Sequence, residues 1–224
     1  MRAVNTVSRI LAVAAASAAL ASLAAADAPY PSQPGAEIVQ GGADAGFLEL
    51  FSTLAAQGPV LAKFTEYRFF PFRTAPVVLQ GEMRFSPERG LSLHYLRPEE
   101  SVVIADEQGL ILRDASGRSR VIQKDPHLPD IGGILVPILR FESAPLFKAF
   151  HVHGALSGLA WRVDFVPRSA EVARWVGTVT VEGSAGTVAR IEFRRSSTQR
   201  VEIHLEPPAT GVSFGAEERK RYFR

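Results

Sequence analysis

Residues 59–68 read Pro-Val-Leu-Ala-Lys-Phe-Thr-Glu-Tyr-Arg, and three further segments of similar character follow at 81–87, 91–95 and 97–104. Apolar and polar residues alternate or nearly alternate in each of them, which is the pattern of a strand with one buried face. The residues expected to share an apolar face are Val60, Ala62 and Phe64 in the first strand, Val77, Leu79, Gly81, Met83 and Phe85 in the second, and Leu91, Leu93 and Tyr95 in the third. We therefore expect consecutive antiparallel strands that present one broad apolar concavity.

The first 26 residues have the features of a secretory signal peptide. Arg2 and Arg9 form a basic start, residues 10–25 are an apolar run rich in Ala and Leu, and Ala24 to Ala26 offer a small-residue cleavage site. The alternative is a membrane anchor, but a spanning helix needs about 20 strongly apolar residues and this run is shorter and mostly alanine. We expect export and cleavage near Ala26.

Charge and cysteine content exclude several classes of function. Loss of the two signal-peptide arginines leaves 23 basic residues against 23 acidic ones. The mature chain therefore gives no electrostatic argument for a nucleic-acid partner. The sequence contains no cysteine, so disulfides and thiol chemistry are excluded and an exported form must rely on burial of a core.

The remaining chain divides into a flexible leader at 27–42, a folded domain at 43–215 and a charged, frayed C-terminal tail at 216–224. Residues 43–56 have helical spacing, with Phe47, Leu50, Phe51 and Leu54 on one face. Further strands are expected at 110–114, 120–123, 159–167, 172–182, 187–194 and 200–205, with a last edge at 212–214, and a short helix is expected at 143–149.

Residues 131–141 also repeat apolar residues at helical spacing, but Gly132, Gly133 and Pro137 interrupt them. Glycine costs about 1 kcal/mol and interior proline about 3 kcal/mol relative to alanine in a helix. Two interpretations remain open: a short broken core helix, or a segment that must move.

The sequence contains no recognisable catalytic constellation. His151 and His153 share one face of an expected strand, but zinc normally takes three or four ligands and no further ligands follow at a suitable spacing. Glu99 and Glu100 are adjacent, so in a strand they point to opposite faces and cannot act as a pair. We predict no enzyme, no cofactor and no metal site, and a large apolar concavity with a breakable cover favours lipid binding.

Four motifs, in this order, resemble those of the LolA-like periplasmic lipoprotein carriers. Phe-Thr-Glu-x-Arg at 64–68 resembles the family's FTQ strand, and Gly-Glu-Met-Arg-Phe-Ser-Pro at 81–87 resembles its G-x-L-x-F/V strand. Residues 98–106 resemble its QP-x-ES and V-S-D-G pair, and Phe193 with residues 201–208 resembles its F-x-F-x-PP close. Glu66 stands where the motif has glutamine, and Pro87 stands where archetypal carriers have an arginine that ties the lid shut.

The resemblance spans residues 47–214 and implies an α+β fold, mainly antiparallel β: a half-open, incomplete β-barrel with a helical lid over an apolar cavity. It implies a monomeric periplasmic carrier that binds the acyl chains of a lipoprotein or another lipid and ferries it from an inner-membrane donor toward an outer-membrane acceptor. The alternative is a non-catalytic periplasmic lipid-sensing or protein-interaction module on the same fold. The shared apolar face and the helical spacing predict these cavity residues: Phe64, Met83, Phe85, Leu93 and Tyr95 on the sheet, and Ile134, Leu135 and Ile138 on the cover.

Overall fold

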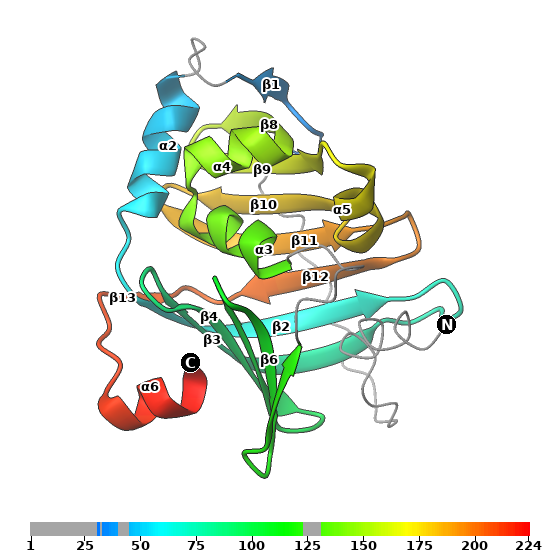
Figure 1. Cartoon of the computed structure of the whole chain (residues 1–224). Helices are drawn as coiled ribbons and strands as arrows, with labels where there is room; N and C mark the ends of the chain where they lie inside the picture. The colour runs from blue at the N-terminus through cyan, green and yellow to red at the C-terminus, as the bar shows by residue number, and fades with distance from the viewer. Residues whose placement is uncertain (1–30, 32, 40–44, 123–130) are drawn as a thin grey trace.

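The computed structural model describes residues 31, 33–39, 45–122 and 131–224. In these residues one antiparallel sheet has the strand order β1-β8-β9-β10-β11-β12-β2-β3-β4-β5-β6-β7, with β13 paired to β2. The path ends at β1 and β7, so within the described residues the sheet curls but does not close (Figure 1). The prediction of a mainly antiparallel, half-open barrel with helices is confirmed. The strands are β1 (Ala36–Ile38), β2 (Val60–Phe69), β3 (Val77–Ser86), β4 (Gly90–Arg97), β5 (Ser101–Asp106), β6 (Gly109–Asp114), β7 (Ser119–Ile122), β8 (Phe150–Ser157), β9 (Ala160–Pro167), β10 (Thr178–Ser184), β11 (Thr187–Arg194), β12 (Arg200–Leu205) and β13 (Ala209–Thr210).

The strands β2, β3 and β4 align their apolar faces through their register. Ala62 lies opposite Met83, and Met83 in turn lies opposite Leu93. Side chains two residues apart share a face of a strand, so this register continues one apolar face across three strands. The strand opposite Phe64 carries Gly81, where a Cβ atom would come within 2.8 Å of the Phe64 ring and 2.2 Å of the His94 carbonyl oxygen. Only glycine leaves room there for the phenyl ring.

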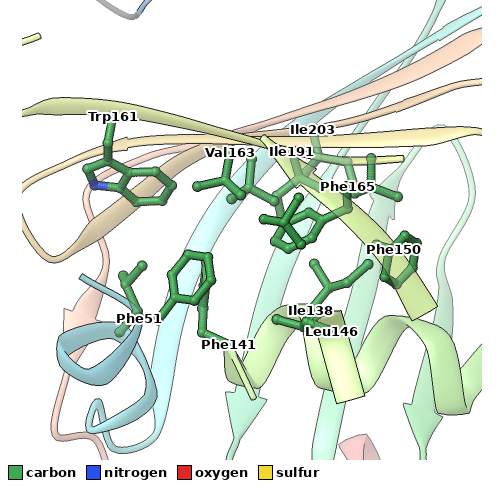
Figure 2. Close-up of a cluster of buried hydrophobic side chains, with 14 of the residues drawn as sticks. Phe51, Ile138, Phe141, Leu146, Phe150, Trp161, Val163, Phe165, Ile191 and Ile203 are labelled. Atoms are coloured by element: carbon green, nitrogen blue, oxygen red, sulfur yellow. The ribbon is translucent and has the colours of Figure 1, made fainter. Parts of the chain in front are cut away.

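Helices α2 (Ala45–Ala55), α3 (Ile131–Arg140) and α4 (Ser143–Ala149) lie against the concave face of the sheet (Figure 1). Figure 2 shows their side chains meeting those of the sheet, with Trp161 and Phe165 from β9 facing Phe51 from α2 and Ile138 from α3. Phe141, just after α3, bridges the two layers, since its ring packs against both Phe51 and Trp161 at centroid distances of 5.7 and 6.2 Å. These contacts form the main hydrophobic core.

The segment at 131–141, whose sequence leaves open both a broken core helix and a segment that must move, contains the helix α3, which continues through Pro137. Proline cannot donate the backbone hydrogen bond that would join it to residue 133, four positions earlier. The helix ends at Arg140, and the next residue, Phe141, has a positive φ of 50° and donates its backbone N–H to the Ile138 carbonyl at 3.2 Å. α3 is thus a short helix that lacks one internal hydrogen bond and packs through its apolar face.

The prediction of a strand from 172 to 182 is wrong in its first half. Residues Ala170–Trp175 form the helix α5, and β10 begins only at Thr178. The hydroxyl of Ser169 accepts the backbone N–H of Val172, which caps the helix N-terminus, and Gly177 ends the turn after it with a φ of 73°. The apolar residues of this stretch are Val172, Trp175 and Val176, which follow helical rather than strand spacing.

The two ends of the domain are also tied to the sheet. Within the expected flexible leader, Ala36–Ile38 form β1, which pairs with β8 and buries Ile38. Within the expected frayed tail, Ala216–Tyr222 form the helix α6, which lies on the outer face of the sheet (Figure 1). Tyr222 and Phe223 are buried there in a second hydrophobic cluster, and the Arg84 guanidinium lies 3.9 Å from the Tyr222 ring centre. The edge expected at 212–214 is not a strand, although β13 pairs just before it.

Candidate functional site

An apolar cavity lies between the concave face of the sheet and the helices α2 and α3. Side chains from both halves of the sheet line it, so it lies where β2–β4 and β10–β12 face the same space. Gln57 alone among the described lining residues has a polar side chain, and its amide donates to the Gly186 carbonyl. The lining residues are Leu54, Gln57, Val60, Ala62, Met83, Phe85, Leu91, Ile138, Leu139, Phe141, Val181, Val188, Ile191, Leu205 and Pro208.

The cavity has a volume of about 60 Å³. Pockets that hold small molecules usually measure roughly 300–1,000 Å³. The cavity is therefore at least about fivefold too small for an acyl chain in this conformation. A ligand of that kind can enter only if one of the covering elements moves away from the sheet.

The structure divides the predicted site residues into two groups. Met83 and Phe85 on β3, with Ile138 on α3, line the cavity. The others belong to the same hydrophobic cluster without lining it: Phe64, Leu93 and Tyr95 are buried, and Ile134 and Leu135 are half-buried on α3. An acyl chain longer than the present cavity would contact this second group, whose role in binding stays a prediction.

Sequence reasoning missed the lining residues from the second half of the sheet. Val181 and Ile191 are direct cross-strand partners on β10 and β11, and both are buried. Both lie in strands with clear alternation, which could have indicated their inward orientation. Their place beside Met83 depends on the pairing of β12 with β2, which joins segments more than 130 residues apart and leaves no local signal.

A buried polar cluster occupies the other end of the same inner face. Glu66 is 1% exposed and Arg68 5% exposed, and the Glu66 carboxylate accepts hydrogen bonds from the Arg68 guanidinium and from the Tyr95 hydroxyl, the latter at 2.6 Å. Burial raises the pKa of Tyr95 well above its usual range, and the Glu66 charge raises it further. Burial lowers the pKa of Arg68, but the same carboxylate outweighs this, so the Arg68 pKa is raised.

The inner face of β2 is therefore apolar at the start of the strand and charged at its end. Val60 and Ala62 line the apolar cavity, Phe64 follows, and the charged pair Glu66 and Arg68 completes the face. The Phe64 ring meets the Tyr95 ring edge-on at 5.3 Å and separates the cavity from the polar cluster. No sequence signal distinguished Glu66 and Arg68 from exposed strand residues except their place in the alternation.

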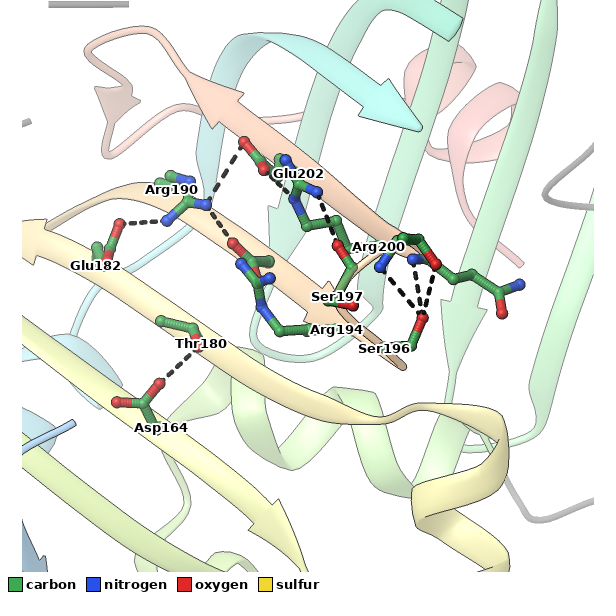
Figure 3. Close-up of polar contacts among 12 residues, drawn as sticks. Asp164, Thr180, Glu182, Arg190, Arg194, Ser196, Ser197, Arg200 and Glu202 are labelled. Carbon is green, nitrogen blue, oxygen red and sulfur yellow. Dashed lines mark hydrogen bonds and ion pairs between the residues drawn. The ribbon is translucent and has the colours of Figure 1, made fainter. Parts of the chain in front are cut away.

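The opposite face of β9–β12 carries a network of ion pairs (Figure 3). Arg190 contacts Glu182 at 2.8 Å and Glu202 at 3.5 Å, and Arg162 contacts Asp164 at 2.8 Å. Partial burial raises the pKa of Glu202, but hydrogen bonds from His204 and Arg200 and the charge of Arg190 outweigh it and lower the pKa to about 2. This face offers charges rather than apolar surface, so it is unsuited to acyl chains.

The two histidines of β8 lie near the chain's N-terminal strand rather than in a ligand cluster. His151 Nδ1 is 2.8 Å from a Glu37 carboxylate oxygen, and hydrogen bonding to this imidazole lowers the pKa of Glu37. Within the part of the chain that the structure describes, no group of three or more His, Cys, Asp or Glu side chains is arranged to hold a metal ion. No described helix is long and apolar enough to cross a membrane.

No protein-family model matches the chain, and no curated protein sequence matches it. Among solved structures, the chain is similar to a domain from Vibrio parahaemolyticus that is described as a candidate outer membrane lipoprotein-sorting protein, with 8% identity over 77% of this chain and 93% of that one and a TM-score of 0.43. A DUF1329 family protein from Desulfovibrio piger is 7% identical over 76% and 94% of the two chains, with a TM-score of 0.42. A LolA superfamily protein from Nitrosomonas europaea is 6% identical over 74% and 94%, with a TM-score of 0.39. All three likenesses are distant, with TM-scores below 0.5.

Proposed function

We propose that the protein is a carrier that binds the acyl chains of a lipoprotein or another lipid between the concave face of the sheet and the helices α2 and α3. In this proposal it is a periplasmic protein that ferries its cargo toward the outer membrane. The observation that carries the proposal is the cavity, because two helices and both halves of the sheet surround it with apolar side chains.

The energetics of acyl binding fit a carrier that must also release. Each buried methylene contributes about 0.8 kcal/mol, so roughly a dozen would contribute on the order of 10 kcal/mol before opposing terms. The present cavity of about 60 Å³ must first widen, which separates part of α3 from the sheet and opposes binding. We therefore expect a net affinity nearer micromolar than picomolar.

Helix α3 is the element best suited to move. It contributes Ile138 and Leu139 to the cavity lining, and its interior proline removes one helical hydrogen bond. Interior proline disfavours a helix by about 3 kcal/mol relative to alanine, which lowers the free energy needed to distort α3. Ile134, Leu135 and Leu139 are only half-buried, so its outer turns lose little contact with the core on opening.

The proposal is tested by native mass spectrometry and lipid extraction of the purified protein, together with titration of a fluorescent fatty-acyl probe. Phe85 is half-buried at the cavity, so Phe85→Lys can keep its ammonium in water while it places charge at the site. Val77→Lys is the matched control, because Val77 is half-buried on the same strand but does not line the cavity. We expect Phe85→Lys to weaken probe binding at least tenfold and Val77→Lys to leave it unchanged, with both variants folded by circular dichroism.

The small volume of the cavity favours one alternative, a non-catalytic lipid-sensing or protein-interaction module on the same fold. Such a module would be purified without bound lipid and would bind the acyl probe no more tightly in the parent protein than in Phe85→Lys. That result would reject the carrier function and favour the module.

A further inference from the structure

Two neighbouring hairpin turns lie at the strand ends beyond the polar cluster, and we call the rim of the sheet that they form the edge, although it is made of strand ends and not of an edge strand. One connects β2 to β3 through residues 70–76, and the other connects β11 to β12 through residues 195–199. Phe69 at the end of β2 is the cross-strand partner of Arg200 at the start of β12, and the Arg200 guanidinium lies 3.6 Å from the Phe69 ring centre. The two turns are therefore neighbours, and Figure 1 shows both on the same side of the sheet.

The first turn exposes aromatic surface. Phe72 is 80% exposed, and its ring stacks on that of Phe70 at a centroid distance of 5.4 Å and an interplanar angle of 24°. Pro71 between them restricts the backbone of the turn. A large aromatic side chain held in water at a turn has no role in the core, and no described element covers it.

The second turn and its surroundings are basic. The sequence contains no acidic residue between Glu66 and Glu82 or between Glu192 and Glu202. Arg194 and Arg200 pair with these last two glutamates, which lie further along the strands. Arg73 and Arg195 are exposed and form no ion pair with any residue that the structure describes. The edge thus combines two stacked aromatic rings with unneutralised positive charge.

We propose that this aromatic and basic edge docks on an anionic lipid bilayer. Phe72 and Phe70 would enter the interface between headgroups and acyl chains, while Arg73 and Arg195 would contact lipid phosphates. A protein partner fits less well, because a stable protein interface buries roughly 800 Å² on each side, whereas the apolar part of this edge is a single hairpin tip. A bilayer accepts so small an apolar element, and each arginine near an anionic surface adds to binding.

This inference goes beyond the proposed acyl-binding function and is independent of it. The cavity lies at the start of β2, around Val60 and Ala62, whereas the docking edge begins where β2 ends at Phe69. A variant of the docking edge can therefore lose membrane binding while it keeps its affinity for an acyl probe in solution.

The test is flotation of the purified protein with vesicles of phosphatidylcholine that contain phosphatidylglycerol, compared with vesicles of phosphatidylcholine alone. We expect binding to the anionic vesicles that weakens as salt is added. Phe72→Ser should lower the apparent affinity about tenfold, because it removes one phenyl group from the interface. Arg73→Gln and Arg195→Gln should each lower it about fivefold and reduce its dependence on salt.

Leu159→Ser is the matched control for loss of an exposed apolar side chain. Leu159 is 75% exposed in the turn between β8 and β9, at the end of the sheet opposite Arg194. Leu159→Ser should leave vesicle binding unchanged. Phe72→Ser should retain the circular dichroism spectrum and the acyl-probe affinity of the parent protein. The proposal is overturned if the parent protein does not float with anionic vesicles, if it floats equally with neutral ones, or if Leu159→Ser reduces binding as much as Phe72→Ser does.

Discussion

Replacing Ala62 with valine should stabilise the protein and weaken acyl binding at the same time. Ala62 is 3% exposed on β2, lines the cavity and lies opposite Met83. Valine adds two methyl groups, on the order of 50 Å³ if each takes nearly the share of a water molecule. The cavity volume of about 60 Å³ is large enough for both.

The size of both effects follows from the cavity volume. Residual cavities destabilise proteins by about 24 cal/mol per Å³, so filling this one can recover at most about 1.4 kcal/mol of unfolding free energy. The same free energy favours the closed conformation over the open one that binds an acyl chain. Because 1.4 kcal/mol is a factor of ten in an equilibrium constant, the apparent Kd for an acyl probe should rise about tenfold.

Urea unfolding and titration with a fluorescent fatty-acyl probe measure the two quantities on the same protein. The control is Ala105→Val: Ala105 is 2% exposed on β5 but does not line the cavity, so valine there overpacks the core. Overpacking should destabilise by about 1–3 kcal/mol and leave probe affinity unchanged in the folded protein. If Ala62→Val destabilises the protein as Ala105→Val does, the site holds no usable void. If Ala62→Val is more stable yet binds the probe as tightly as the parent, acyl chains bind elsewhere.

Three further predictions concern the lid, the buried polar cluster and the ion-paired face. Gly133→Ala should favour the helical form of α3 by about 1 kcal/mol and slow release of an acyl probe up to about fivefold in stopped-flow measurements; unchanged release at equal stability would mean that α3 is no gate. Tyr95→Phe should lower the free energy of unfolding by about 1.5–3 kcal/mol, because it removes the hydroxyl that donates to the buried Glu66 carboxylate; a loss under about 0.5 kcal/mol in urea would contradict this. Glu202 has a pKa of about 2 in the folded protein against an ordinary value of 4.5, so its contribution to stability should be complete above pH 4.5 and disappear as the pH falls toward 2. Glu202→Gln should flatten the stability profile in that window, and a profile identical to the parent's would refute the assignment.

The sequence predicted the first half of the sheet because strand alternation there is strong and the turns are short. The predicted inward residues of β2 and β3 are buried or half-buried, from Val60 to Phe64 and from Leu79 to Phe85. The pairing of β12 with β2 was not predictable in the same way, since hydrophobic pattern gives the face of a strand but not its distant partner. This pairing brings the two halves of the sheet together around the cavity, so the lining residues between Val181 and Pro208 were out of reach.

The sequence pattern also predicted the wrong element where helical spacing and strand spacing overlap. Residues 172–182 contain enough valine to suggest one long strand, but Ser169 caps a helical turn and Gly177 separates it from β10. In the tail, the charges of α6 suggested a solvated end. Its two buried aromatic residues, Tyr222 and Phe223, instead hold it on the outer face of the sheet.

The buried charges at Glu66 and Arg68 show a different limit of sequence reasoning. Their positions in the alternation of β2 place them on the inner face, whereas their charge favours the outer one. The two side chains are buried on the inner face despite their charge, because they pair with each other and the Glu66 carboxylate also accepts a hydrogen bond from Tyr95. Residue type alone could not reveal this, since the third partner comes from β4.

Three features of the concave face each reduce stability: two adjoin the cavity, and the third lies beyond Phe64 on the same face of β2. The void of about 60 Å³ leaves apolar side chains without partners, α3 contains a proline, and a buried ion pair usually stabilises no better than apolar residues of the same size. Stability alone would favour a filled core, an uninterrupted helix and an apolar residue in place of Glu66. Natural sequences depart from these stabilising choices mainly where function requires it, and here all three departures lie on the concave face of the sheet. Their coincidence supports a face that must open and receive a ligand, rather than one that only packs.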